Sequence, residues 1–383
     1  MIYFDNSATT KPYNEVIEAF AKVSQEYYAN PSSLHNFGGK VETLVHQARK
    51  QIASLLQVKD NEIYFTSGGT EGNNLAIKGT ALQYRSRGNH IITTTVEHPS
   101  VYEACEQLRS LGFDITYLPV NQKGQVELDD LKSAIKDETI LVSIMHVNNE
   151  MGTIQPIEEI GQLLNEYSKI LFHVDHVQGI GKVPLNLKQA HVDFCTISAH
   201  KFHGLKGSGI LYIRNGVRIS PLFSGGNQEN KVRSGTENVG GIVTMAKALR
   251  LTEANRKQKL EEMISIRDFL ISSLTKLPTI KVHTVPSVSA PHIINFSAIG
   301  LRGEVVVHAL EAEKIYVSTT SACSSKQKSI SRTLQAIGVT EDIAEGAVRI
   351  SLSYENTMDE AKIFMSKLES IINKLNEVMR DTQ

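Results

Sequence analysis

The chain has 383 residues, 40 of them basic and 41 acidic, and its formal net charge of -1 provides no basic excess for a nucleic-acid groove. Its length can bury a large core, and the usual size of domains leads us to expect two. Its start lacks a cationic segment followed by an apolar run, and its longest apolar stretch, TILVSIMHV, is too short to cross a bilayer, so we expect a cytoplasmic protein without membrane contact.

Between about residues 15 and 250, short apolar runs rich in β-formers alternate with amphipathic helical stretches such as 72–86 and 157–169. This alternation is typical of βα units around a mainly parallel sheet. The runs predict seven strands, at 62–67, 90–98, 113–120, 139–150, 169–178, 192–201 and 209–215. We therefore predict an α/β fold with helices on both faces of this sheet.

Residues 238–276 have helical periodicity without a proline, which predicts one long connecting helix. After it the pattern changes to a mixture of strands and helices, typical of a smaller α+β domain. Its strands are predicted at 292–298, 314–319 and 347–353, and its helices at 303–313, 331–338 and 358–379. We expect a large domain over 15–255 and a small domain built from 1–14 and 256–383.

The three cysteines, Cys105, Cys195 and Cys323, are too few and odd in number for a disulfide framework, which suits a reducing compartment. Cys105 lies in a helical stretch and Cys195 in the apolar run VDFCTI, so both are predicted to be structural. Cys323 instead lies in the polar stretch STTSACSSKQKS, which has few anchors for packing and predicts a mobile loop.

Several predicted strands end in reactive polar residues, and ligands of open α/β sheets bind beyond the carboxyl ends of the strands. These residues are His98, Asn148, Asn149, Asp175, Gln178, Ser198, His200 and Lys201. The first strand ends in Gly68, Gly69 and Thr70 before a helix, and such a turn can hold one phosphate. A plain strand-to-helix turn with a threonine cap would have the same sequence.

Two chemistries could use this set. A metal site could draw on His173, Asp175, His176, His200 and His203. However, neighbouring strand residues point to opposite faces, so His176 would point away from Asp175, and we predict no metal. The second chemistry is that of pyridoxal phosphate, which needs a lysine for its aldehyde, a carboxylate for its ring nitrogen and a phosphate cradle. Lys201, Asp175 and the Gly-Gly-Thr turn match these needs.

Ordered motifs along essentially the whole chain now support a more specific reading. They are YFDNSATT (3–10), NPSSLH (30–35), FTSGGTEGNNLAIKG (65–79), EH (97–98), HVNNEMG (146–152), HVDHVQGIGK (173–182), SAHKFHGLKGSG (198–209), RSGTEN (233–238), SACSS (321–325) and VRISLS (348–353). With them the sequence resembles the cysteine desulfurases of the NifS/IscS type, pyridoxal phosphate enzymes of the class-V aminotransferase family with aminotransferase-like fold type I.

The resemblance implies a role for each matching residue. It implies Lys201 at the cofactor aldehyde, Asp175 at the pyridine nitrogen, Gln178 at the ring oxygen, and His98 stacked on the ring and moving protons. It implies that Gly69, Thr70, Ser198 and His200 hold the phosphate, with Thr236 reaching in from the partner subunit of a homodimer. Asn149 and Arg349 are implied to fix the substrate carboxylate, Arg349 as a bidentate clamp.

By resemblance, Cys323 is the nucleophile that takes the sulfur of L-cysteine as a persulfide while L-alanine leaves, and His98 accepts the thiol proton. The sulfur would pass to a protein acceptor, such as an iron–sulfur scaffold or a tRNA-thiolation enzyme. Three features depart from the family pattern: His176 in place of a small residue, the lysine-rich segment after Cys323, and SLSYEN after Arg349.

Rival readings stay open at this point. A selenocysteine lyase or another β-eliminating lyase of the same fold would need no protein thiol, so Cys323 argues against it. A sulfur-relay or docking protein without catalysis would need none of Lys201, Asp175, His98 and Arg349. A metal-dependent hydrolase is the third alternative.

Overall fold

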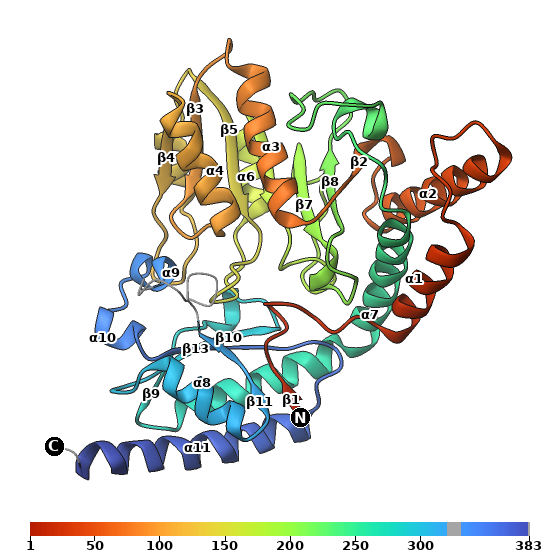
Figure 1. Ribbon diagram of the computed structural model, residues 1–383. Coiled ribbons are helices and arrows are strands. Elements are labelled where there is room, and N and C mark those ends of the chain that lie inside the picture. Colours follow the sequence, from red (N-terminus) through yellow and green to blue (C-terminus); the bar gives the residue numbers. More distant parts are fainter. Residues whose placement is uncertain (320–330, 382–383) are drawn as a thin grey trace.

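The computed structural model describes residues 1–319 and 331–381, and its largest element is a seven-stranded sheet (Figure 1). The strand order is β2-β8-β7-β6-β5-β3-β4, with β3 to β7 parallel to one another and β8 antiparallel to both β2 and β7. The strands are β2 (Ile63–Thr66), β3 (His90–Thr94), β4 (Asp114–Leu118), β5 (Thr139–Met145), β6 (Leu171–Asp175), β7 (Phe194–Ser198) and β8 (Gly209–Ile213). The predicted seven strands and the mainly parallel sheet are confirmed.

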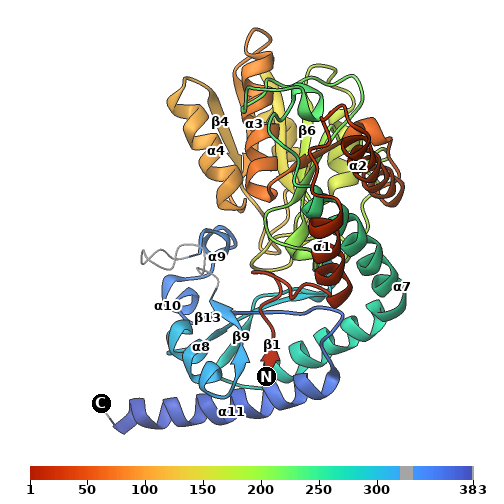
Figure 2. The same cartoon turned by 45° about the vertical axis from the view of Figure 1, so that its right-hand side comes forward.

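Helices cover both faces of this sheet, as its almost continuously apolar strands predict (Figure 2). Along β3, Ile91 packs into the core beneath α3 and α4, and the next residue, Ile92, packs into the core on the opposite face, which α2 and α6 cover. The helices are α1 (Asn14–Glu26), α2 (Asn36–Leu55), α3 (Gly69–Tyr84), α4 (Pro99–Ser110), α5 (Leu128–Ala134) and α6 (Ile157–Leu164). Cys105 and Cys195 are buried in these two cores.

One long helix, α7 (Val239–Thr275), connects the large sheet to the rest of the molecule. Asn238 caps its start by accepting a hydrogen bond from the Gly241 N–H at 3.0 Å. Its first half packs into the core of the large sheet through residues such as Met245, whereas its second half packs through Leu270 into a separate core. The predicted connecting helix is confirmed.

The separate core lies under a four-stranded antiparallel sheet of order β12-β13-β10-β9, with α11 along its lower side (Figure 1). Ile2 and Phe4 from the chain start belong to this core, and β1 pairs in parallel with β11. The elements are β1 (Ile2–Tyr3), β9 (Ile280–Val282), β10 (Ile293–Ala298), α8 (Gly303–Ala312), β11 (Ile315–Tyr316), β12 (Ser318–Thr319), α9 (Arg332–Ala336), α10 (Glu341–Ala344), β13 (Ala347–Ser351) and α11 (Met358–Asp381).

The domain boundary at residue 255 stays a prediction, because α7 runs through that position without a break. Among the helices of residues 1–319 and 331–381, none has the length and apolar character that spanning a membrane requires.

Candidate active site

The carboxyl ends of the parallel strands bring most of the predicted site residues to one edge of the large sheet. Asp175 is the last residue of β6 and Ser198 is the last residue of β7. Lys201 ends the 3-10 turn Ala199–Lys201 that follows β7 directly. His98 caps α4 at the corresponding end of β3. Residues more than 100 positions apart in sequence therefore meet at one place, as expected for this edge of an open sheet.

Asp175 is buried and its carboxylate is held on both oxygens. Oδ2 accepts a hydrogen bond from Asn73 Nδ2 at 2.7 Å, and Oδ1 accepts one from the Val177 backbone N–H at 3.0 Å. Asn73 reaches this point from α3, which begins at the predicted phosphate turn. These two donors fix the direction of the carboxylate.

His98 is linked to Asp175 through two polar side chains. Asn73 Nδ2 also donates to Ser100 Oγ at 2.8 Å, and Ser100 Oγ lies 2.8 Å from His98 Nδ1. Nδ1 accepts a further hydrogen bond from the Ser100 backbone N–H at 3.1 Å. Burial lowers the pKa of His98, while Asp175 opposes that shift. The neutral ring with Nδ1 as acceptor carries its proton on Nε2, so Nε2 is a hydrogen-bond donor.

The predicted phosphate turn has the close packing and backbone conformation that require glycine. Gly68 has φ +152°, a region that side chains of L-residues rarely adopt. A Cβ on Gly69 would lie 3.0 Å from Val177 Cγ2 and 3.5 Å from Ser198 Cβ. Thr70 follows in the first turn of α3. Burial, with Lys201 adding to it, lowers the pKa of His200 to about 4, and its neutral ring places Nδ1 3.2 Å from Thr9 Oγ1.

Lys201 contacts the segment that begins the chain. Its Nζ donates to the backbone oxygens of Ser7 at 2.5 Å and Ala8 at 2.9 Å. Gln178 Nε2 donates to the same Ser7 oxygen at 3.0 Å. The backbone oxygen of Lys201 accepts a hydrogen bond from Lys182 Nζ at 2.7 Å. Lys201 and Gln178 therefore meet at the Ser7 oxygen, and Lys182 holds the backbone of the turn that carries Lys201.

Arg349, on β13 of the smaller sheet, reaches the same edge of the large sheet. Its Nη1 donates to the Asn149 backbone oxygen at 2.8 Å, and its Nη2 lies 3.0 Å from Asp5 Oδ1. Its Nε is buried and finds no hydrogen-bond partner within the described residues. A buried guanidinium with a spare donor is suited to a bound carboxylate.

Two predicted site residues are not joined to this cluster. Thr236 is exposed and lines a surface hollow together with Ser67 and Gly207, so its reach across a dimer stays a prediction. Cys323 and the predicted mobile loop around it lie outside the described residues.

The remaining histidines of the motifs have structural partners. His173 lies between Ser143 Oγ at 2.8 Å and Thr196 Oγ1 at 3.0 Å. His176 turns away from Asp175 and places its Nδ1 2.8 Å from His146 Nδ1. In the part of the chain that the structure describes, no three His, Cys, Asp or Glu side chains are placed to hold a metal ion.

Four residues that support the site carried no predicted role: Asp5, Asn73, Lys182 and Glu97. All four stand inside motifs, and Asn73 lies four residues after Gly69, on the same face of α3, so its position was readable. Burial is the main cause that raises the pKa of Glu97 to about 8, and that lowers the pKa of Lys182 to about 7. Nothing in the sequence indicated that Glu97 and Lys182 are buried.

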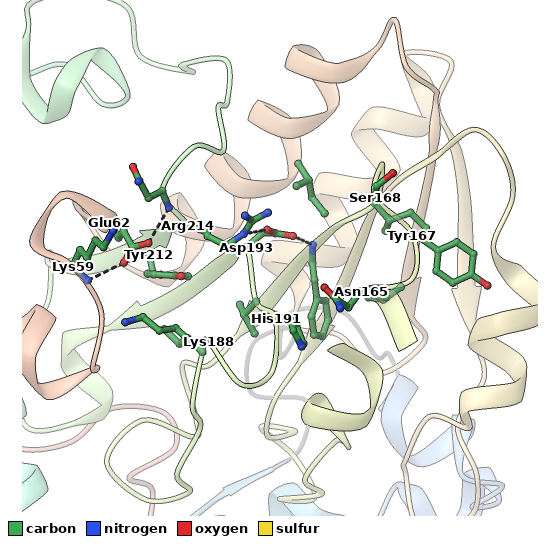
Figure 3. Close-up of a pocket in the computed structure, with 17 residues that line it drawn as sticks. Lys59, Glu62, Asn165, Tyr167, Ser168, Lys188, His191, Asp193, Tyr212 and Arg214 are labelled. Carbon is green, nitrogen blue, oxygen red and sulfur yellow. Dashed lines mark hydrogen bonds and ion pairs between the residues drawn. The ribbon is translucent and has the colours of Figure 1, made fainter. Parts of the chain in front are cut away.

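A second hollow, of about 500 Å³, lies at the opposite edge of the sheet, where β6 and β7 begin (Figure 3). Its central carboxylate, Asp193, is already satisfied, because it accepts from the Phe172 N–H at 2.8 Å and from Arg214 Nε at 2.6 Å. Neither Lys201 nor His98, the predicted catalytic residues within the described ranges, lines it. The candidate active site is therefore at the carboxyl edge.

Comparisons with known proteins identify relatives over nearly the whole chain. The family model of class-V aminotransferases matches residues 2–364. A NifS/IcsS protein homolog of Lactobacillus delbrueckii subsp. bulgaricus is 47% identical, over 99% of both chains. The cysteine desulfurase IscS of Dictyoglomus turgidum is 45% identical, over 98% of this chain and 96% of its own. The solved structure of a NifS-like protein superposes with a TM-score of 0.92 at 40% identity, over 97% of this chain and 99% of its own.

Proposed function

This chain belongs to the class-V aminotransferase family, and from that membership we propose that it is a pyridoxal phosphate-dependent cysteine desulfurase that converts L-cysteine to L-alanine. The observation that carries the proposal is the pair of groups at neighbouring strand ends, Asp175 with both carboxylate oxygens held and Lys201 directly after β7. This pairing of a fixed carboxylate with a lysine is what the cofactor requires.

The residues present fit the cofactor. Asp175 would hold the ring nitrogen, Lys201 the aldehyde and Gln178 the ring oxygen. The phosphate would lie against Gly69, Thr70, Ser198 and His200, where a side chain in place of Gly69 would collide with Val177. When bound, the cofactor supplies an electron sink for bond breaking at the substrate α-carbon.

The substrate carboxylate would be bound by Arg349 with Asn149 beside it. The spare buried Nε of Arg349 supports this role, since a carboxylate would satisfy it. His98 would stack on the ring and donate a hydrogen bond from Nε2. That it accepts the thiol proton stays a prediction, and its Nδ1 already accepts the Ser100 N–H.

Cys323 is the proposed nucleophile. As a thiolate it attacks the substrate sulfur: an S–S bond forms, the C–S bond breaks, and its electron pair leaves with the three-carbon fragment that becomes L-alanine after protonation. The described chain on either side starts near the substrate groups, since Ser318 pairs with Arg349, and Ser331 Oγ donates to the carboxylate of Glu150, the neighbour of Asn149. Cys323 is four residues beyond Thr319, a reach of up to about 14 Å.

Replacing Cys323 with alanine tests the sulfur step. The variant should keep the cofactor absorbance but release no alanine from L-cysteine, whereas Ser324→Ala, in the same stretch, should behave like the wild type. Mass spectrometry of the wild-type protein after reaction should find one added sulfur on the Cys323 peptide. Normal alanine release by Cys323→Ala would contradict the mechanism and favour a plain β-elimination.

Replacing Lys201 with alanine tests the cofactor anchor. The near-visible absorbance of the lysine-bound cofactor should disappear. The cofactor itself should still bind, because the turn with Gly69 and Thr70 would still hold its phosphate. A variant that retains that absorbance would show that another amine holds the aldehyde.

We infer a homodimer in which Thr236 completes the partner's phosphate site, and a protein acceptor for the persulfide sulfur. An iron–sulfur scaffold and a tRNA-thiolation enzyme are the acceptor classes to test, with L-cysteine labelled on its sulfur. The acceptor is the protein that carries the label after separation from the enzyme, and transfer to neither class would reject both assignments.

A further inference from the structure

Asp5 stands next to the group that is proposed to bind the substrate. Its Oδ1 lies 3.0 Å from Arg349 Nη2, and the two side chains are 21% and 7% exposed. The position of Asp5 is fixed by the backbone, because its segment forms a parallel bridge to Ser351, two residues after Arg349 on β13. This ion pair joins the beginning and the end of the chain and is largely shielded from water.

The pair leaves Arg349 able to bind a second carboxylate. Nη1 is bound to the Asn149 oxygen and Nη2 to Asp5, whereas the buried Nε has no partner in the described ranges. A guanidinium has five N–H donors, and two of them are used here. Counted over the described ranges, three donors therefore remain, and a substrate carboxylate would bind through them while Asp5 keeps its own.

Asp5 also interacts electrostatically with Lys201. The segment that begins with Asp5 continues to Ser7 and Ala8, whose backbone oxygens hold Lys201 Nζ. Burial raises the pKa of Asp5, whereas the positive charges of Arg349 and Lys201 lower it. Tyr3 is a further titratable neighbour, whose pKa is raised by burial and by Asp5. The Asp5 carboxylate is thus a negative group that feels both cations of the site.

We propose that Asp5 selects zwitterionic amino acids: its carboxylate receives the ammonium group of the substrate whose carboxylate Arg349 binds. The inference rests on the proposed function, which places the substrate at Arg349. An amino acid carries its two charges on adjacent carbons, and Arg349 and Asp5 offer the two opposite charges side by side. A carboxylic acid without an ammonium group meets only repulsion from Asp5, so the site rejects it.

The test compares L-cysteine with 3-mercaptopropionate, the same molecule without its amino group, in wild type and Asp5→Asn. Asparagine keeps the oxygen that accepts from Arg349 Nη2 but removes the charge. We expect kcat/KM for L-cysteine to fall about tenfold through KM, as for a lost charged hydrogen bond, and calorimetry to find 3-mercaptopropionate bound severalfold more tightly to the cofactor-loaded variant.

Glu15→Gln is the matched control, because it removes one exposed carboxylate from the same end of the chain and should change neither value. The inference is overturned if Asp5→Asn lowers both kcat/KM for L-cysteine and the affinity for 3-mercaptopropionate, which means that Asp5 merely holds Arg349. It is also overturned if Asp5→Asn changes neither value, or if Glu15→Gln reproduces its effect. Failure of wild type to release alanine would instead reject the proposed function, and calorimetry with 3-mercaptopropionate is independent of turnover.

Discussion

Replacing Glu97 with glutamine should remove a pH-dependent loss of stability. Glu97 Oε1 accepts from Thr94 Oγ1 at 2.8 Å and from the Met145 N–H at 3.0 Å, and its buried Oε2 has no partner within the described residues. Burial, against these two hydrogen bonds, raises its pKa from 4.5 to about 8. The folded protein therefore binds this proton more tightly than the unfolded chain does, and stability falls as pH rises from 4.5 to 8.

The magnitude follows from the pKa. Between pH 6 and the folded pKa of about 8, the folded carboxyl keeps a proton that the unfolded one has already lost. The free energy of unfolding therefore falls by about 3 kcal/mol, at 1.36 kcal/mol per pH unit, and the fall ends by about pH 9. Glutamine does not titrate, so Glu97→Gln should match the wild type only near pH 4.5, and its advantage should grow between pH 6 and pH 9 by several degrees in unfolding midpoint.

Thermal unfolding of the cofactor-loaded proteins across this pH range measures the difference. Comparing variant and wild type at each pH cancels the other titrating groups. Glu62→Gln is the control, because Glu62 is equally buried but accepts backbone N–H groups on both oxygens, from Asn215 and Lys59. Parallel curves for Glu97→Gln and wild type would refute the reasoning.

Two further predictions concern groups that hold the site from behind. Lys182→Met removes an amine whose pKa burial lowers from 10.5 to about 7. Wild-type stability rises with pH between these two values, so the variant should be the more stable of the two near pH 6 in thermal unfolding. It should nevertheless lose the cofactor faster, because the backbone oxygen of Lys201 loses its donor. Asn73→Ala removes the 2.7 Å hydrogen bond to Asp175, and absorbance titration should show about tenfold weaker cofactor binding. Asn74→Ala, one position along α3, should bind the cofactor normally.

The chain of bonds from Asp175 through Asn73 and Ser100 to His98 has a chemical consequence. It holds the imidazole in the form that carries its proton on Nε2. The motif EH predicted that His98 belongs to the site. Which ring nitrogen carries the proton depends on the hydrogen bond that Nδ1 accepts, and its donor, the Ser100 N–H, comes from the first turn of α4.

His176 shows the limit of reading a departure from a family pattern. The alternation of faces along a strand predicted that it would point away from Asp175. In the fold it turns to the other side of β6 and pairs with His146, at 2.8 Å between the two Nδ1 atoms. Burial lowers the pKa of both rings, so the pair is neutral, with one nitrogen donating and the other accepting.

The strands and the polar residues at their ends could be predicted from the sequence. The seven apolar runs form β2 to β8, because such runs are long enough to cross a buried sheet and are bounded by residues that end strands. The convergence of His98, Asp175, Ser198 and Lys201 at one edge also follows from sequence, since parallel strands present their carboxyl ends together.

Which of these side chains touch depends on how the elements pack together, and local sequence does not show it. Asp5 and Arg349 are 344 residues apart and Asn73 and Asp175 are 102 apart, and each pair meets only because strand order and register place them side by side. The shifted pKa values have the same origin. Whether a buried carboxyl such as Glu97 stays protonated depends on the exclusion of water by neighbouring elements, and local sequence does not carry that information.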